Sequence, residues 1–173
     1  MFFEGYHGTD SDSVTSIIKN GYNLSNNKQS LGKGVYFFQD YYNLCNGLEE
    51  AKNWAIHVKK FERWSVLKVN IDTEKYIDIF LDVKHREMFD VIKKELIKKH
   101  LEAGKNIKTF NENAIFRKLE EQDIDLIRVL VDATKDIGYP KYVVRRPQVQ
   151  ICVKTTKVIV DNILIKQGKR VSL

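Results

Sequence analysis

Cysteine is scarce in this chain, and its scarcity limits the sites that the chain can form. Cys45 and Cys152 are the only two among 173 residues. They lie far apart and do not have the short spacing of a zinc-binding pair. A structural disulfide is not expected, and a reducing cytoplasm is the expected location.

Long apolar runs are also missing. No stretch approaches the roughly 18 consecutive apolar residues of a membrane-spanning helix. The first residues, MFFEGYHG, have neither the basic region nor the apolar run of a secretion signal. We therefore expect a soluble cytoplasmic protein with no membrane partner.

Motifs for metals and for nucleoside triphosphates are absent as well. His57, His85 and His100 are scattered over segments with a helical pattern and lack the spacing of metal ligands. The glycine-containing segment 31–34, LGKG, is too short for a P-loop and leads into a strand. We expect no bound metal.

Charge gives the first positive indication of a partner. The chain has 29 Lys and Arg against 23 Asp and Glu, a net charge of +6. This excess mildly favours polyanions such as a nucleic acid or a dinucleotide. Most of the lysines lie in helical patterns, where a solvated helix face also accounts for them.

Hydrophobic periodicity predicts one α+β domain over residues 1–173. The expected elements are strands over 1–9, 34–38, 65–72, 141–144, 149–153 and 157–165, and helices over 10–20 and 49–61. Asp10 or Ser11 should cap the first helix, and Gly21 should end it.

The middle of the chain differs in character. Residues 84–136 are charged and have a helical pattern, so we expect a helical insertion within the domain. Ile124, Ile127 and Val131 are expected to form one stripe of a helix that Gly138 and Pro140 end.

Three short motifs carry the functional signal when they are taken in order. They are YHGT at 6–9, GVYF at 34–37 followed by AKNW at 51–54, and QVQICV at 148–153. A single histidine, an apolar strand or a glutamine on a strand is each usually structural. Three motifs in a fixed order are far more specific than any one of them.

This order of motifs resembles the ADP-ribosyltransferases of the diphtheria-toxin and poly(ADP-ribose)-polymerase class. The resemblance spans most of the chain, apart from residues 84–136. It implies a fold of split antiparallel β-sheets with flanking helices, and a cleft between the sheets for NAD as substrate. The residues that it implies for NAD binding are His7, Gly8, Thr9, Gly34, Tyr36 and Trp54.

The resemblance also assigns roles to individual residues. His7 would hold a ribose hydroxyl, and Gly8 would let main-chain groups reach the carboxamide. Tyr36 would lie against one face of the nicotinamide ring. Trp54 either covers the other face or is a core residue of its helix. His7, Tyr36 and Gln148 are implied as catalytic, so we expect them to line one cleft.

The third motif departs from the family, which usually has glutamate in this position. Gln148 donates and accepts hydrogen bonds but carries no charge and is no general base. Gln150 fills the position instead if the strand is shifted by two residues, whereas Val149 and Ile151 would face the other way. Polymer extension then becomes improbable, and transfer of one ADP-ribose unit to a nucleophilic acceptor remains.

The acceptor and the biological role are predicted less directly. Lys141, Arg145 and Arg146 precede the third motif, where an acceptor would dock. With the net charge, they favour a nucleic acid, RNA before DNA, over a protein acceptor. Alternatively, these cations grip the NAD pyrophosphate. The size and the family suggest a bacterial or phage toxin or an antiviral effector, and a toxin of this kind can have a neutralising antitoxin protein.

Two other functions stay open at this point. The RNA 2′-phosphotransferases share the fold and an HGT-like start, but they have a second histidine where this chain has Tyr36. A non-catalytic module that binds NAD or ADP-ribose is consistent with the missing glutamate.

Overall fold

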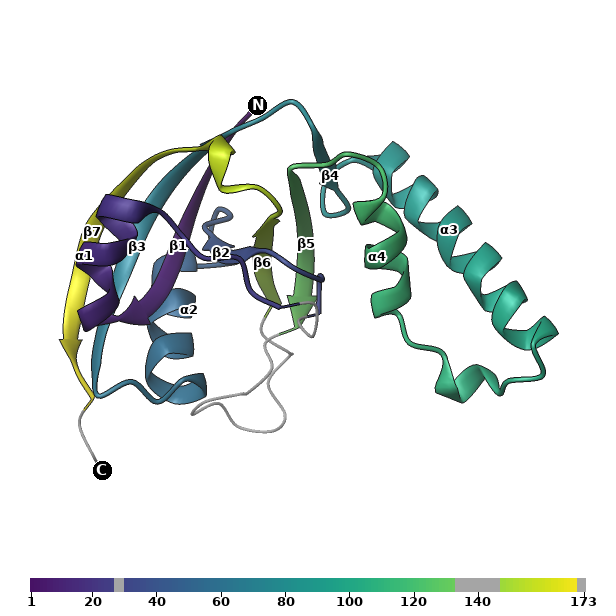
Figure 1. Cartoon of the computed structure of the whole chain (residues 1–173), viewed down its shortest axis with the longest axis horizontal. Coiled ribbons are helices and arrows are strands. Elements are labelled where there is room, and N and C mark those ends of the chain that lie inside the picture. The colour runs from purple at the N-terminus through teal and green to yellow at the C-terminus, as the bar shows by residue number, and fades with distance from the viewer. Residues whose placement is uncertain (27–29, 133–146, 171–173) are drawn as a thin grey trace.

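A computed structural model describes residues 1–26, 30–132 and 147–170 of the chain. Within them it has four α-helices and one mixed sheet of seven strands, so the expected α+β class is confirmed (Figure 1). The strands are β1 Phe2–Asp10, β2 Val35–Gln39, β3 Arg63–Asp72, β4 Tyr76–Asp78, β5 Leu126–Asp132, β6 Pro147–Val153 and β7 Ile159–Lys169. The α-helices are α1 Val14–Asn20, α2 Gly47–Asn53, α3 Val83–Glu102 and α4 Asn113–Glu120.

Short helical turns complete these elements. They are η1 Ser11–Ser13, η2 Trp54–Val58, η3 Ile107–Thr109 and η4 Thr156–Val158. The Asp10 side chain accepts a hydrogen bond from the Asp12 amide at 3.0 Å, and α1 is followed by Gly21 with φ of 81°. Both boundaries of the first expected helix are thus confirmed. η2 continues α2 as a π-helical turn, in which the Lys59 amide donates to the Trp54 carbonyl.

The strand order places distant parts of the sequence side by side. The sheet runs β4-β5-β6-β2-β1-β3-β7 (Figure 1). β1, β2 and β6, which carry the three motifs, are therefore neighbours in its centre. β4 and β5 are parallel, and the other neighbouring strands are antiparallel.

The expected pair of split sheets is present as one sheet with a weak junction. β1 pairs with β3 along its whole length, from Phe2 to Asp10, but with β2 only at Tyr6 and Phe38. Beyond this pair the β1–β2 ladder ends. The halves β4-β5-β6-β2 and β7-β3-β1 thus meet at one paired position within the described residues.

The prediction of a helix through Ile124, Ile127 and Val131 is wrong. Residues 126–132 form β5, which pairs with both β4 and β6. The helical segment ends with α4 at Glu120, and residues 133–136 lie outside the described residues. The run LIRVLVD is rich in β-branched residues, which pack well on a pleated sheet, and pairing on both edges decides its conformation.

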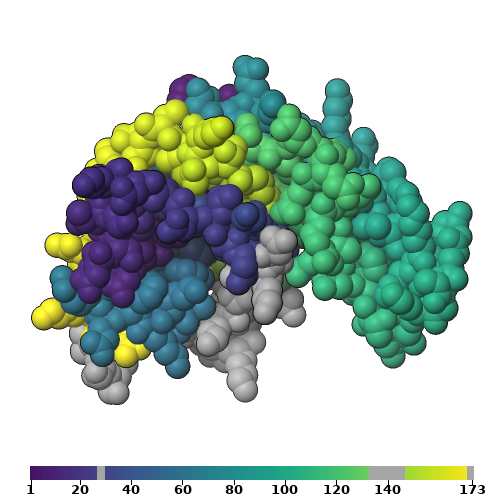
Figure 2. Space-filling model, in the orientation of Figure 1, coloured from purple at the N-terminus to yellow at the C-terminus, as the bar shows by residue number. Residues whose placement is uncertain are grey.

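Three clusters of buried side chains hold the layers together. One lies on the sheet face that carries Phe37 and Ile151, and α1 follows β1 beside it. α2 covers a second cluster around Phe38, with Ala51 and Ala55 fully buried. α3 and α4 cover a third around Cys152. Together α3 and α4 project from the β4 end of the sheet (Figures 1 and 2).

Candidate functional site

His7 is tied to the second motif through its ring. Its Nδ1 lies 2.8 Å from the main-chain carbonyl oxygen of Tyr36. Because a carbonyl only accepts, Nδ1 carries the proton and Nε2 is left as a hydrogen-bond acceptor. The ring makes an edge contact with Tyr22 and a tilted contact with Phe37. Burial lowers the pKa of His7 below 6.5, so the neutral form is favoured.

The pKa of His7 predicts how stability changes with pH. The unfolded chain takes up a proton near pH 6.5, whereas the folded protein resists it, so the free energy of unfolding should fall as pH drops below about 6.5. His7→Asn removes this titration and should flatten the slope between pH 7.5 and 5.5, measured by urea unfolding. Replacing the exposed His57 on η2 in the same way is the control. An unchanged slope in His7→Asn would show that His7 does not titrate in this manner.

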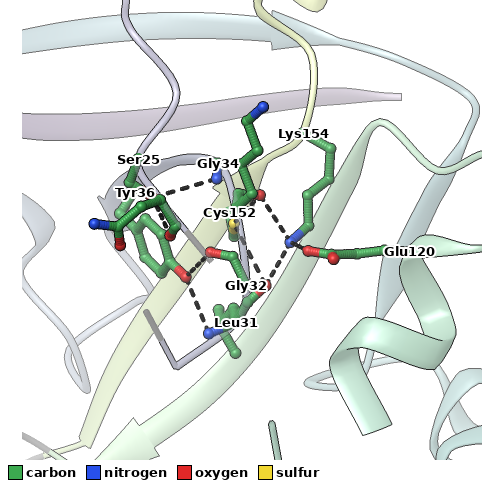
Figure 3. A network of polar contacts seen from close by, with 10 residues as sticks. Ser25, Leu31, Gly32, Gly34, Tyr36, Glu120, Cys152 and Lys154 are labelled. Carbon is green, nitrogen blue, oxygen red and sulfur yellow. Dashed lines mark hydrogen bonds and ion pairs between the residues drawn. The ribbon is translucent and has the colours of Figure 1, made fainter. Parts of the chain in front are cut away.

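Tyr36 has a structural task that the sequence did not indicate. Its hydroxyl accepts a hydrogen bond from the Leu31 amide at 3.0 Å and donates to the Gly32 carbonyl at 2.8 Å (Figure 3). The ring is half-buried and packs against the cluster around Cys152. Burial raises the pKa of the hydroxyl, which therefore stays protonated. Tyr36 thus fastens the loop before β2 onto the sheet.

The rings of His7 and Tyr36 do not line one surface. The His7 ring contacts Phe37, whereas Tyr36, the residue before it, packs with Cys152. Successive side chains of a strand leave on opposite faces, so the two rings lie on opposite faces of β2. The expectation of one cleft lined by both rings is therefore not met. What joins the first two motifs is the Tyr36 main chain.

Lys154 strengthens the attachment of the same loop. Its ammonium donates to the carbonyl oxygens of Leu31 and Lys33 and to Glu120 on α4, the last at 2.5 Å (Figure 3). A hollow of about 280 Å³ opens beside this group, and its lining includes Ile124. None of the predicted site residues lines it.

Gly8 lets α2 approach the first motif. A Cβ atom at Gly8 would lie 2.1 Å from the Ala51 carbonyl oxygen and 3.2 Å from the Ala55 Cβ. Such distances are impossible, so β1 and α2 pack this closely only because residue 8 has no side chain. Thr9 beside it is buried. Gly34 has a similar role at the start of β2, where a Cβ would meet the Cys152 sulfur at 2.4 Å.

Trp54 lies at the junction of α2 and η2. Its ring is partly buried against the cluster under α2, and the Lys59 ammonium lies 5.0 Å from the ring centroid. The structure therefore gives Trp54 the packing role that was one of its two expected roles. A role in covering nicotinamide stays a prediction.

The third motif is resolved in favour of Gln148 by its contacts. Gln148, Gln150 and Cys152 share one face of β6, and Cys152 pairs with Tyr36. Gln148 is 8% exposed, and its amide nitrogen donates to the carboxylate of Glu50 on α2. The Gln150 amide donates to the Gln148 oxygen at 3.3 Å.

The two residues that were excluded from the third motif are core residues. Val149 and Ile151 are buried, with exposures of 1% and 0%. They leave β6 on the opposite face from Gln148, as the two-residue period requires. Their exclusion as ligands is confirmed.

Glu50 is the polar residue of this region that the sequence did not single out. It lies in the first turn of α2 and is 4% exposed. An acidic residue in a first turn is ordinary because it offsets the helix dipole. The available signal was its position four residues before Trp54 and one before Ala51, which places it beside the apolar stripe.

The proposed acceptor residues cannot be placed. Lys141, Arg145 and Arg146 lie outside the described residues. Elsewhere, residues 1–26, 30–132 and 147–170 hold no group of three or more His, Cys, Asp or Glu side chains placed to bind a metal ion. The helices within these ranges are all too short or too polar to cross a membrane.

Comparison of the chain with protein-family models, with curated proteins and with solved structures finds no match. The function must therefore be inferred from the residues and their geometry.

Proposed function

We propose that the protein is a mono-ADP-ribosyltransferase that uses NAD as its substrate and has the split-sheet arrangement of that class. One observation carries the proposal. Three motifs from residues 6–9, 34–37 and 148–153 lie on β1, β2 and β6, which are adjacent strands at the centre of the sheet. The His7–Tyr36 contact joins the first two motifs, and α2 contacts both the first and the third.

The divergence of β1 from β2 suggests where NAD would bind. His7 and Gly8 come directly after Tyr6, the single β1 residue paired with β2. The Nε2 of His7 is suited to accept a hydrogen bond from a ribose hydroxyl, because Nδ1 is already a donor to Tyr36. The main chain of Gly8 is not paired with β2 and is unshielded by a side chain, which suits contact with a carboxamide.

The reaction asks for electrostatic stabilisation more than for proton transfer. The bond between nicotinamide and the ribose breaks with its electron pair leaving on the nicotinamide nitrogen. The ribose then carries a positive charge until the acceptor adds to it and releases a proton. Fixed dipoles and charges that face the ribose lower this barrier. Gln148, held by two side chains, offers such a fixed dipole.

RNA is the acceptor class that we propose, with one ADP-ribose unit transferred. The net charge of +6 supports a polyanionic acceptor. A site whose third motif is an amide suits a nucleophile that needs no strong base, such as an amino group or ring nitrogen of a nucleobase. A role as a toxin or antiviral effector is part of this proposal.

The first test is the release of nicotinamide from NAD by purified protein. Labelled NAD should also transfer its ADP-ribose to an RNA pool more than to separate pools of DNA and protein. His7→Asn should lower kcat/KM for nicotinamide release roughly ten-fold, since one hydrogen bond to substrate is lost. Incorporation into RNA should weaken as salt is raised.

The outcomes separate the alternatives. Binding of NAD with no release of nicotinamide would contradict catalysis and support a non-catalytic module. Incorporation confined to the protein pool would contradict the RNA proposal but not the NAD chemistry. Removal of a 2′-phosphate from RNA ends in the presence of NAD would support a phosphotransferase instead.

A further inference from the structure

Glu50 places a carboxylate beneath the third motif, where the sequence of β6 has none. It extends from the first turn of α2 and is 4% exposed. Asn46 caps this helix, its side-chain oxygen accepting from the Glu49 amide at 2.9 Å. Glu50 comes from a different element than Gln148 and lies 98 residues from it in sequence.

A buried carboxylate is expensive to keep for packing alone. Taking an ionised group out of water costs several kcal/mol unless hydrogen bonds and nearby charges offset it. A neutral or apolar side chain of similar size is usually at least as stabilising at such a position. The position of Glu50 therefore asks for a functional reason.

The bond to Glu50 fixes the orientation of Gln148. A carboxylate only accepts hydrogen bonds, so the amide nitrogen of Gln148 must face Glu50. Its oxygen then faces Gln150, which donates to it at 3.3 Å. A hydrogen bond from an amide to a carboxylate is about twice as strong as one between neutral groups. Gln148 is consequently held in one orientation.

Glu50 also lies close to the first motif. The next residue of α2, Ala51, has the carbonyl oxygen that would be 2.1 Å from a Cβ at Gly8. A single turn of α2 thus contacts β1 at Gly8 and β6 at Gln148, the two strands on either side of β2. The carboxylate is in the region where the ribose of NAD would sit under the proposed function.

We propose that Glu50 supplies from α2 the negative charge that Gln148 lacks, and that it acts as the positioning residue for Gln148 during ADP-ribosyl transfer. This rests on the proposed function above. As nicotinamide leaves with the bonding electrons, the ribose cation forms near the Gln148 amide, and the charge of Glu50 stabilises it through that amide. Glu50 takes no proton; the proton released by the acceptor passes to water.

An exchange of the two side chains tests this. Glu50→Gln removes the charge and should lower kcat for nicotinamide release about 10²- to 10³-fold, with KM for NAD changed less than about three-fold. The double variant Glu50→Gln with Gln148→Glu restores one carboxylate and one amide in contact. It should regain at least about ten-fold of the lost kcat.

The matched control is Glu49→Gln. Glu49 is the neighbouring acidic residue of the same helix turn, and it pairs with Lys52 at 2.9 Å and Lys166 at 2.7 Å rather than with Gln148. Its replacement should leave kcat as in the wild type. Thermal unfolding of every variant separates a loss of folded protein from a loss of rate.

Each result bears on one of the two proposals. Wild-type protein that releases no nicotinamide overturns the proposed function and this inference with it. Active wild-type protein with an equally active Glu50→Gln variant overturns the inference alone. If the exchange restores thermal stability but not kcat, the pair is merely structural and the inference is also overturned. If Glu50→Gln does not fold, the kcat of the exchanged protein decides.

Discussion

Replacing Gly8 by alanine is expected to cost about 3 kcal/mol of the free energy of unfolding. The added Cβ would lie 2.1 Å from the Ala51 carbonyl oxygen, and a main-chain atom of a packed helix cannot yield as a flexible side chain can. α2 would have to move away from β1. Urea unfolding with an unchanged slope against denaturant would give the difference directly.

Gly21→Ala provides the comparison for this substitution. Gly21 has φ of 81° and no neighbouring atom within 4 Å of an added Cβ. Its replacement thus carries only the cost of left-handed backbone, about 1–2 kcal/mol. Because α2 carries Glu50, Gly8→Ala should also reduce nicotinamide release by the protein that remains folded. A Gly8→Ala protein as stable as the wild type would show that α2 does not pack against β1 as described.

Tyr36→Ala is expected to be nearly as costly, about 3 kcal/mol. The substitution opens a cavity beside Cys152 and leaves the loop before β2 without its attachment to the Tyr36 hydroxyl. Tyr36→Phe keeps the ring and loses only the two hydrogen bonds, so it should cost about 1–2 kcal/mol. Tyr42→Ala is the control, because Tyr42 is 89% exposed and its loss should cost less than about 0.5 kcal/mol.

Activity measured on the same variants separates the two roles of Tyr36. If the ring contacts nicotinamide, Tyr36→Phe should keep most of the rate and Tyr36→Ala should lose it even where the protein is fully folded. If Tyr36 only holds the loop, the rate should follow the folded fraction in both variants. A stable and active Tyr36→Ala protein would contradict both roles.

The sequence predicted the elements whose patterns are local. The strand through His7, the helix capped at Asp10 and ended at Gly21, and the helix with Ala51 and Ala55 on its buried side were all found. Alternation along β6 also separated Gln148 from Val149 and Ile151 without any structure. Caps and side-chain periods depend on neighbours in sequence, which is why these features could be read directly.

Other features depended on partners distant in sequence. The run 126–132 has apolar positions compatible with a helix, and it became a strand because β4 and β6 pair with its two edges. The faces of β2 were also settled by packing, which placed Tyr36 with Cys152 and the His7 ring with Phe37. Conformation at such positions follows from the pairing and burial of the whole sheet.

By itself the sequence determined the order of the three motifs and the α+β class, since both are written in residue identity and period. Only the tertiary structure decided that β1, β2 and β6 are adjacent, that Gly8 serves the approach of α2, and that Glu50 meets Gln148. The physical reason is that a contact between a helix and a strand 98 residues apart has no local pattern. It exists because burial brings both side chains out of water, and each polar group there must find a partner.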